Sequence, residues 1–192
     1  MAFDELLKTA RAKSGKTQSQ LAERSGVAVP NISAIESGKR VPRFDTAEAL
    51  LRSLGYRLLP IEIGRSTAWE VSTYIHEFLA EDDLGAVFRC WLQLNNDFVA
   101  LGASSRYLLA VEAPAATGSA QWDAAIAALV EHRLNELNLP IPEWVSQAWR
   151  SLSEPESLVT YKGMKYQVSV EEAPAAFAKH NILFPEESLV SY

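Results

Sequence analysis

Apolar residues recur every three or four positions along most of the chain, the spacing that gathers them on one face of an α-helix. In residues 1–60 this pattern predicts five short helices joined by tight turns. The clearest are Phe3–Arg11, Gln18–Ser25, a third beginning near Val29 and a fourth that holds Thr46 and Leu54. A compact all-helical domain follows from this pattern.

Polar residues and glycine mark the ends of these helices. Thr17 and Gln20 have the spacing of an N-terminal capping box, and Gly26 suits the left-handed conformation after a helix. Ile32 and Ile35 are expected to hold the third helix against the second. The N-terminal end of the third helix is then expected to project from the domain.

The pattern changes at residues 56–64, where apolar and polar residues alternate as in a short strand before Gly64. We place the domain joint there, between a domain at 1–60 and a larger helical one at 66–192. In the second domain the spacing predicts the helical segments Trp69–Leu79, Leu84–Leu94, Gln121–Asn138, Glu143–Ser151 and Pro174–His180. Residues 113–120 are expected to form a loop, and 161–170 alternate in part. The expected class is mainly all-α with a short β element.

Charge divides the chain at the same joint. The 192 residues carry a net charge of −6, but residues 1–60 hold ten basic and six acidic residues, and the rest hold eight and eighteen. A basic N-terminal domain joined to an acidic second domain suits one module that binds phosphate and a separate module that binds a partner. The chain has no apolar run long enough to span a membrane, no signal-peptide pattern and one cysteine, Cys90, which points to a cytoplasmic protein.

Residues 17–44 read TQSQLAERSGVAVPNISAIESGKRVPRF. With the flanking helices this run resembles the Cro/CI-type (Xre) helix-turn-helix family over about residues 3–59. The resemblance implies a lambda-repressor-like domain whose third helix enters the major groove of double-stranded DNA. It also implies a homodimer on an inverted-repeat operator.

The resemblance further implies roles for individual residues. Gln18 is expected at a phosphate, Asn31 at an adenine, and Arg11 with Glu36 in an internal salt bridge. The residues expected to contact base edges are Val29, Pro30, Asn31, Ser33 and Ala34. Lys39, Arg40 and Arg43 are expected to contact the DNA backbone, and Ser37 is also expected to bind DNA. Because three base-edge residues lack hydrogen-bonding side chains, we expect few direct base contacts and an operator recognised mainly by its shape.

Residues that resemble catalytic motifs have simpler explanations. His76 and Glu77 begin an H-E-x-x-H pattern, but position 80 is alanine, so the second ligand is missing. The acidic run 81–83 fits a helix start, and His132 and His180 stand apart in sequence. We expect no enzyme activity, no metal and no cofactor.

All five tryptophans lie in the second domain, where core packing accounts for most of them. The segments LVEHRLNELNLPIPEW and APAAFAKHNILFP are similar to the tails of Xre-type antitoxins encoded beside nucleotidyltransferase-like toxins of the AbiEii class. This similarity implies that the tail binds a cognate toxin while the head represses its own operon. The alternatives are a stand-alone regulator whose tail senses a small molecule or only dimerises. A sensor should have a closed apolar pocket, whereas an antitoxin should expose a large apolar patch.

Overall fold

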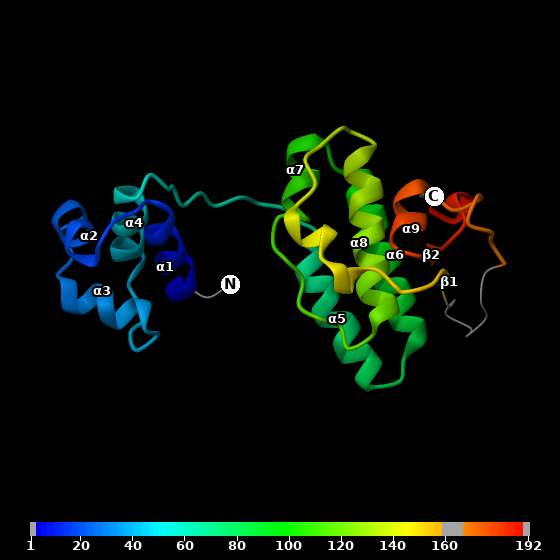
Figure 1. The fold of residues 1–192 in the computed structure, drawn as a ribbon, viewed down its shortest axis with the longest axis horizontal. Coiled ribbons are helices and arrows are strands. Elements are labelled where there is room, and N and C mark those ends of the chain that lie inside the picture. The colour runs from blue at the N-terminus through cyan, green and yellow to red at the C-terminus, as the bar shows by residue number, and fades with distance from the viewer. Residues whose placement is uncertain (1–2, 159–166, 190–192) are drawn as a thin grey trace. The chain divides into compact units, whose positions relative to one another are not determined.

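The computed structural model describes residues 3–158 and 167–189, and the chain divides into two compact units, Met1–Glu62 and Ile63–Tyr192 (Figure 1). Helices dominate both units, which confirms the expected all-α class. The β structure of the described residues is one parallel pair, β1 (Glu156–Ser157) and β2 (Ile182–Leu183). The short β element is therefore formed by residues 156–157 and 182–183 and not by residues 56–64.

The described part of unit 1 has four α-helices: α1 (Phe3–Lys13), α2 (Gln18–Ser25), α3 (Val29–Glu36) and α4 (Phe44–Ser53). This number corrects the expectation of five. The chain leaves α4 through Gly55, whose φ of 92° turns it out of helical geometry, and only Leu58 then packs back on the core of the unit. A further helix would need an apolar face against that core, and one residue does not supply it.

The ends of α2 form as the sequence predicts. The Thr17 hydroxyl accepts a hydrogen bond from Gln20 N at 3.2 Å, and Gln20 Oε1 accepts one from Thr17 N at 2.9 Å. Gly26 takes a φ of 72° and its N–H donates to the Ala22 carbonyl. Leu21, Ile32 and other buried residues then pack α2 against α3, which fixes the direction in which α3 points.

The expected strand at residues 56–64 is wrong. These residues pair with no strand in the described chain, and Pro60 has no N–H to donate to one. Leu59 is 74% exposed and Ile61 53%, while Ile63 packs on the core of unit 2. Alternation alone did not make a strand, because a strand also needs a partner.

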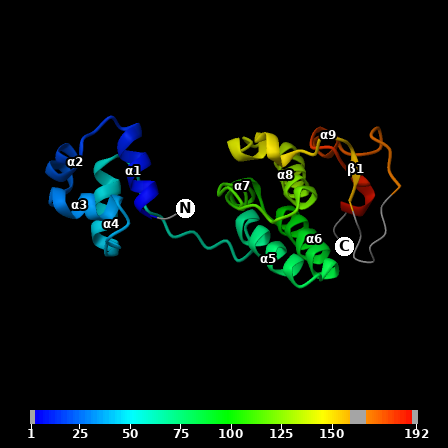
Figure 2. The ribbon, with the colours of Figure 1, turned by 60° about the horizontal axis from the view of Figure 1, so that its bottom comes forward.

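Unit 2 is built around one buried helix. Its longer elements are α5 (Ala68–Ala80), α6 (Leu84–Ala100), α7 (Ala103–Leu108), α8 (Ala120–Asn135) and α9 (Ala175–Lys179). Figure 2 shows α5 and α6 side by side, and both contact α8. Twelve of the sixteen residues of α8 are buried, and its alanines let neighbouring elements approach from several sides. A helix buried in this way needs no polar face.

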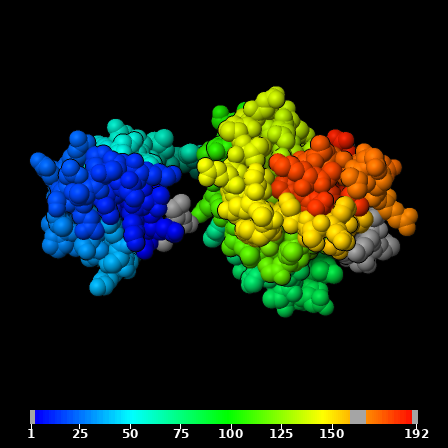
Figure 3. All heavy atoms as spheres, in the orientation of Figure 1, coloured from blue at the N-terminus to red at the C-terminus, as the bar shows by residue number. Residues whose placement is uncertain are grey.

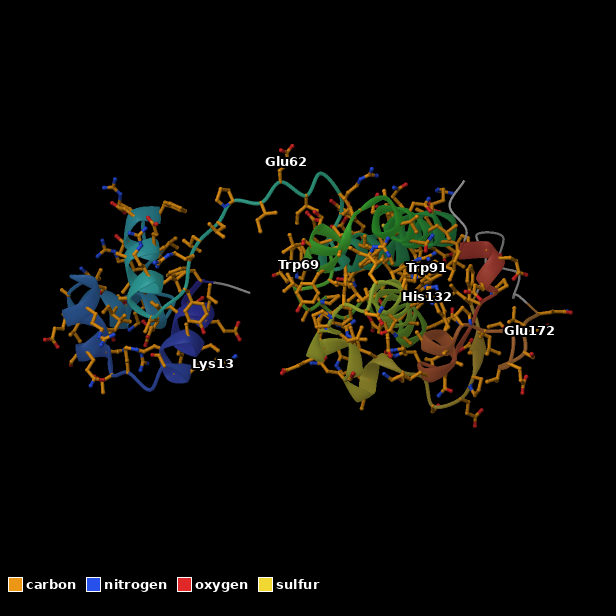
Figure 4. The ribbon with its side chains drawn as sticks, turned by 90° about the horizontal axis from the view of Figure 1, so that it is seen from above. Lys13, Glu62, Trp69, Trp91, His132 and Glu172 are labelled. Carbon is orange, nitrogen blue, oxygen red and sulfur yellow. The ribbon has the colours of Figure 1, made fainter. Side chains whose placement is uncertain are left out.

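Aromatic rings fill the space beside α8. The Trp91 ring lies 5.0 Å from that of Phe184 and 6.1 Å from that of Phe177, and its Nε1 donates to the Ala125 carbonyl at 3.1 Å. Figure 4 shows Trp91 enclosed by side chains. Phe177 and Phe184 come from α9 and the segment after it, so residues 175–189 complete the core.

Buried polar groups attach this segment to α8. Glu131 accepts hydrogen bonds from His180 Nε2 at 2.9 Å and Lys179 Nζ at 2.7 Å. The Arg133 guanidinium donates to the Leu189 carbonyl at 2.7 Å and to Asn95 Oδ1 at 2.6 Å. Figure 3 shows the segments around residues 145 and 180 against each other, and beneath this surface the buried His180 Nδ1 is 2.7 Å from the Arg150 carbonyl.

One predicted helix of unit 2 is broken. Residues 143–151 form two 3-10 turns, η1 (Glu143–Ser146) and η2 (Ala148–Arg150), separated by the extended residue Gln147. Trp144 and Arg150 are six positions apart, so in a continuous α-helix they would lie on different faces. The break at Gln147 allows both side chains to be buried.

Of the remaining predictions for unit 2, some are confirmed and others are not. The short helix expected in 174–180 is confirmed as α9, and 113–119 is irregular as expected. The helix expected to reach Asn138 ends at Asn135, since Asn138 has a φ of 52°. The described chain closes with η3 (Glu186–Leu189). Of the alternating stretch 161–170, residues 161–166 lie outside the described residues and 167–170 form no strand.

Candidate nucleic-acid interface

The outward side of α3 carries the residues expected to contact bases. Ile32 and Ile35 are buried in the core, which leaves Val29, Pro30 and Ser33 exposed on the opposite side. Asn31 and Ala34 are half-buried beside them. Pro30 lies in the first turn, where its missing N–H costs no helical hydrogen bond. The structure thus brings the five residues together on one short helix.

Basic residues follow directly after α3. Lys39, Arg40 and Arg43 are all exposed, and Arg43 Nε lies 4.0 Å from Asp45 Oδ1 at the solvent. Ser37 caps the helix, with its hydroxyl donating to the Ala34 carbonyl at 3.2 Å. Exposed side chains of this kind suit contacts to phosphate, which need charge more than a fixed geometry.

Arg40 also makes a contact that the sequence did not indicate. Its Nη1 donates to Asn31 Oδ1 at 2.7 Å, across nine positions and around the end of α3. Neither the helical period nor any local motif connects these two residues, so sequence analysis had no signal for the pair. The Asn31 amide, expected to be free for an adenine, already has a partner.

Arg11 and Glu36 join α1 to the end of α3. Arg11 Nε donates to Glu36 Oε1 at 2.6 Å and Arg11 Nη2 to Glu36 Oε2 at 2.9 Å. The Gln18 amide adds a third hydrogen bond to the same carboxylate at 2.8 Å. Gln18, expected at a phosphate, thereby uses one of its two amide hydrogens within the domain.

These contacts set the ionisation of the pair. Burial alone would raise the pKa of Glu36, but the hydrogen bonds from Arg11 and Gln18, with the positive charges of Arg11 and Lys8, outweigh it and lower that pKa. The hydrogen bonds that Arg11 donates to Glu36 raise the pKa of Arg11 against the opposing effect of burial. Both groups are therefore charged at neutral pH, and together they join α1 to α3.

Residues 7–61 match the family model described as helix-turn-helix. This segment is an Xre-type helix-turn-helix domain. The domain makes the chain a DNA-binding transcription regulator, with double-stranded DNA as its partner and a location at the nucleoid. A search of curated proteins and of solved structures finds no match to the chain.

Two further findings concern other kinds of site. In residues 3–158 and 167–189, no group of three or more His, Cys, Asp or Glu side chains is arranged to hold a metal ion. The described helices are all too short or too polar to cross a membrane.

His76 and Cys90 have contacts within unit 2. His76 Nδ1 lies 3.0 Å from the Thr117 carbonyl, and Cys90 is half-buried with a pKa raised to about 11 by burial.

Proposed function

We propose that the chain is a repressor that binds an inverted-repeat operator as a homodimer and serves as the antitoxin of a cognate toxin, which binds unit 2. The helix-turn-helix domain supports operator binding. An exposed apolar patch on unit 2 supports a protein partner for the second activity, and this is the observation that carries the proposal.

The patch surrounds the loop at residues 109–118. One end of this loop accepts a hydrogen bond from the start of α5, Ala68 N to the Leu109 carbonyl at 2.7 Å, and its middle binds Arg150 through the Pro114 carbonyl. Exposed apolar residues therefore lie in this loop and in the two segments that bond to it, and we call them the loop patch: Trp69, Val111, Ala113, Ala115, Ala116 and Trp149.

Two tryptophans give the loop patch its significance. Trp69 is 39% exposed and Trp149 45%, whereas Trp91, Trp122 and Trp144 are buried. Trp149 is held by its ring, which stacks 3.9 Å from the Arg150 guanidinium carbon. Exposed tryptophans in fixed positions are typical of the centres of protein–protein interfaces.

Charge indicates the chemistry of the partner. Residues 61–192 hold eight basic and eighteen acidic residues, so a basic protein is attracted to this unit and a nucleic acid is repelled. Among the described residues of unit 2, one pocket of about 470 Å³ has a mainly polar and acidic lining, which includes Gln167, Glu172, Glu186, Glu187 and Ser188. These features favour a protein partner over a sensor of apolar molecules.

Co-expression with the neighbouring open reading frame tests the proposal. A tag on this chain should retain a stoichiometric second protein that arrests growth when expressed alone. Trp69→Ser should weaken retention by about tenfold or more, because one of the two exposed tryptophans is removed. Tyr74→Ser is the matched control, since Tyr74 is exposed on the same helix but about 140° around it.

The outcomes separate the two parts of the proposal. Elution of the chain alone, with operator binding intact, would leave a stand-alone regulator and remove the antitoxin. A monomer in light scattering, with and without operator DNA, would remove the homodimer. Equal retention by the Trp69 and Tyr74 variants would place the toxin outside the loop patch.

A further inference from the structure

The end of α3 returns Arg40 toward the start of that helix. Gly38, with a φ of 71°, turns the chain, and the N–H groups of Lys39 and Arg40 both donate to the Ala34 carbonyl at 2.9 and 3.1 Å. From there the Arg40 side chain reaches back to the amide of Asn31, in the first turn of α3. The guanidinium thus lies at the end of α3 that enters the major groove in helix-turn-helix domains.

This guanidinium is available for a ligand. In the described part of the chain Arg40 forms no ion pair, unlike Arg11 with Glu36 and Arg52 with Glu48. Arginine has five N–H donors in a planar fork, and the contact with Asn31 uses one of them. Among the described residues no carboxylate lies within ion-pair distance of Arg40, although Asp4 lines the same small pocket, so the charge of Arg40 is not paired before DNA arrives.

Three neighbouring side chains of α3 leave the hydrogen bonds to base edges to other residues. Val29, Pro30 and Ala34 have no hydrogen-bonding side chain, so they contribute shape and contact thymine methyl groups at most. A guanine presents O6 and N7 side by side in the major groove, and the arginine fork matches both. Asn31 fixes one nitrogen of the fork and thereby limits the directions in which the others point.

From this geometry we infer that Arg40 reads a guanine in each operator half-site, and that Asn31 is the residue that positions its guanidinium. The inference rests on the proposed operator binding and names its specificity. It replaces two sequence-based expectations: that Arg40 holds the DNA backbone, and that Asn31 pairs independently with adenine.

Selection from a pool of random duplexes with the full chain tests the assignment. The wild-type chain should enrich a guanine at one fixed position of each half-site. Arg40→Ala and Arg40→Lys should both lose the preference at that position, about 5- to 140-fold in relative affinity, and keep the preferences elsewhere. Lysine retains the charge but not the fork, so it distinguishes base recognition from general attraction.

Arg43→Ala is the matched control, because Arg43 is also exposed in the same loop but forms no hydrogen bond with Asn31 in the described structure. It should weaken all duplexes evenly and leave the selected sequence unchanged. Asn31→Ala should relax the same guanine position as Arg40→Ala, and the double variant should add little to either. Circular dichroism melts should be unchanged in all variants, since these contacts are at the solvent.

Two results would overturn the inference. A guanine preference that survives in Arg40→Ala, or an even loss across all duplexes, would return Arg40 to the DNA backbone. Relaxation by Asn31→Ala at a different base position would make Asn31 an independent contact. Failure of the wild-type chain to enrich any sequence would instead reject operator binding itself, which separates the two failures.

Discussion

The ion pair between Arg11 and Glu36 offers a quantitative test of how α3 is held. The Glu36 side chain is 5% exposed and that of Arg11 19%, and two hydrogen bonds of 2.6 and 2.9 Å join them. Hydrogen bonds to a charged group contribute about 1.5–3 kcal/mol each when one partner is removed. Because Arg11 regains water at its exposed edge, we expect Glu36→Gln to cost unit 1 about 2 kcal/mol.

Arg11→Ala should cost more than Glu36→Gln. It leaves a nearly buried carboxylate with Gln18 as its remaining side-chain donor, and it removes the hydrogen bond from Arg11 Nη1 to the Lys16 carbonyl. We expect a loss of about 3 kcal/mol, near the lower end for breaking a buried pair. The double variant should cost less than the sum of the two, with a coupling of about 1–3 kcal/mol.

The distribution of tryptophan makes the measurement specific. All five tryptophans lie between residues 69 and 149, so tryptophan fluorescence reports unit 2, whereas circular dichroism reports both units. For a domain of this size, 2 kcal/mol lowers the midpoint by about 8–16 °C. The circular dichroism transition of unit 1 should fall by that amount while the fluorescence transition stays in place.

Three results would refute this reasoning. Additive losses in the double variant would show that Arg11 and Glu36 act separately. Equal shifts in fluorescence and circular dichroism would show that the two units unfold together. An unchanged melting temperature for Glu36→Gln would mean that the ion pair contributes no more to the stability of unit 1 than the water contacts that replace it.

Other features lead to further predictions. The lowered pKa of Glu36 means that its stabilisation is complete above pH 4.5 and is lost as pH falls through the lowered value; acid melts should show this component in the wild type and not in Glu36→Gln. Thr17→Ala should lower the stability of unit 1 by about 1 kcal/mol, detected by circular dichroism, and Thr67→Ala should do the same to unit 2, detected by tryptophan fluorescence. A fluorescence shift for Thr17→Ala, with none for Thr67→Ala, would contradict the capping assignments. The raised pKa of Cys90 predicts slow alkylation of the native chain at pH 8 and fast alkylation in denaturant; equal rates would place the thiol at the surface.

Local signals in the sequence predicted the helix-turn-helix unit well. Thr17, Gln20 and Gly26 act on their own neighbours, and Ile32 and Ile35 reach the core through the helical period. The same local reasoning failed at residues 56–64, because alternation specifies a strand only when another segment supplies hydrogen bonds. It failed again at Gln147, where the burial of Trp144 and Arg150 decides the break.

Contacts between distant residues account for most of what the sequence did not show. The Asn31–Arg40 pair and the approach of Gln18 to Glu36 depend on the path of the chain around α3. The segments of Trp69 and Trp149, 80 positions apart, likewise meet the loop at 109–118 through hydrogen bonds of their neighbours Ala68 and Arg150. Core packing was expected for most of the tryptophans, but which two lie at the surface follows only from the packing of unit 2.

The burial of α8 has a consequence for the order of events during synthesis. Unit 1 is a compact unit of residues 1–62, so we expect it to fold as soon as those residues have left the ribosome. The core around α8 closes only after Phe177, Ile182 and Phe184 arrive. A polypeptide that stops before residue 175 would carry a finished DNA-binding domain and an open second unit, so truncation there separates occupancy of DNA from everything that unit 2 does.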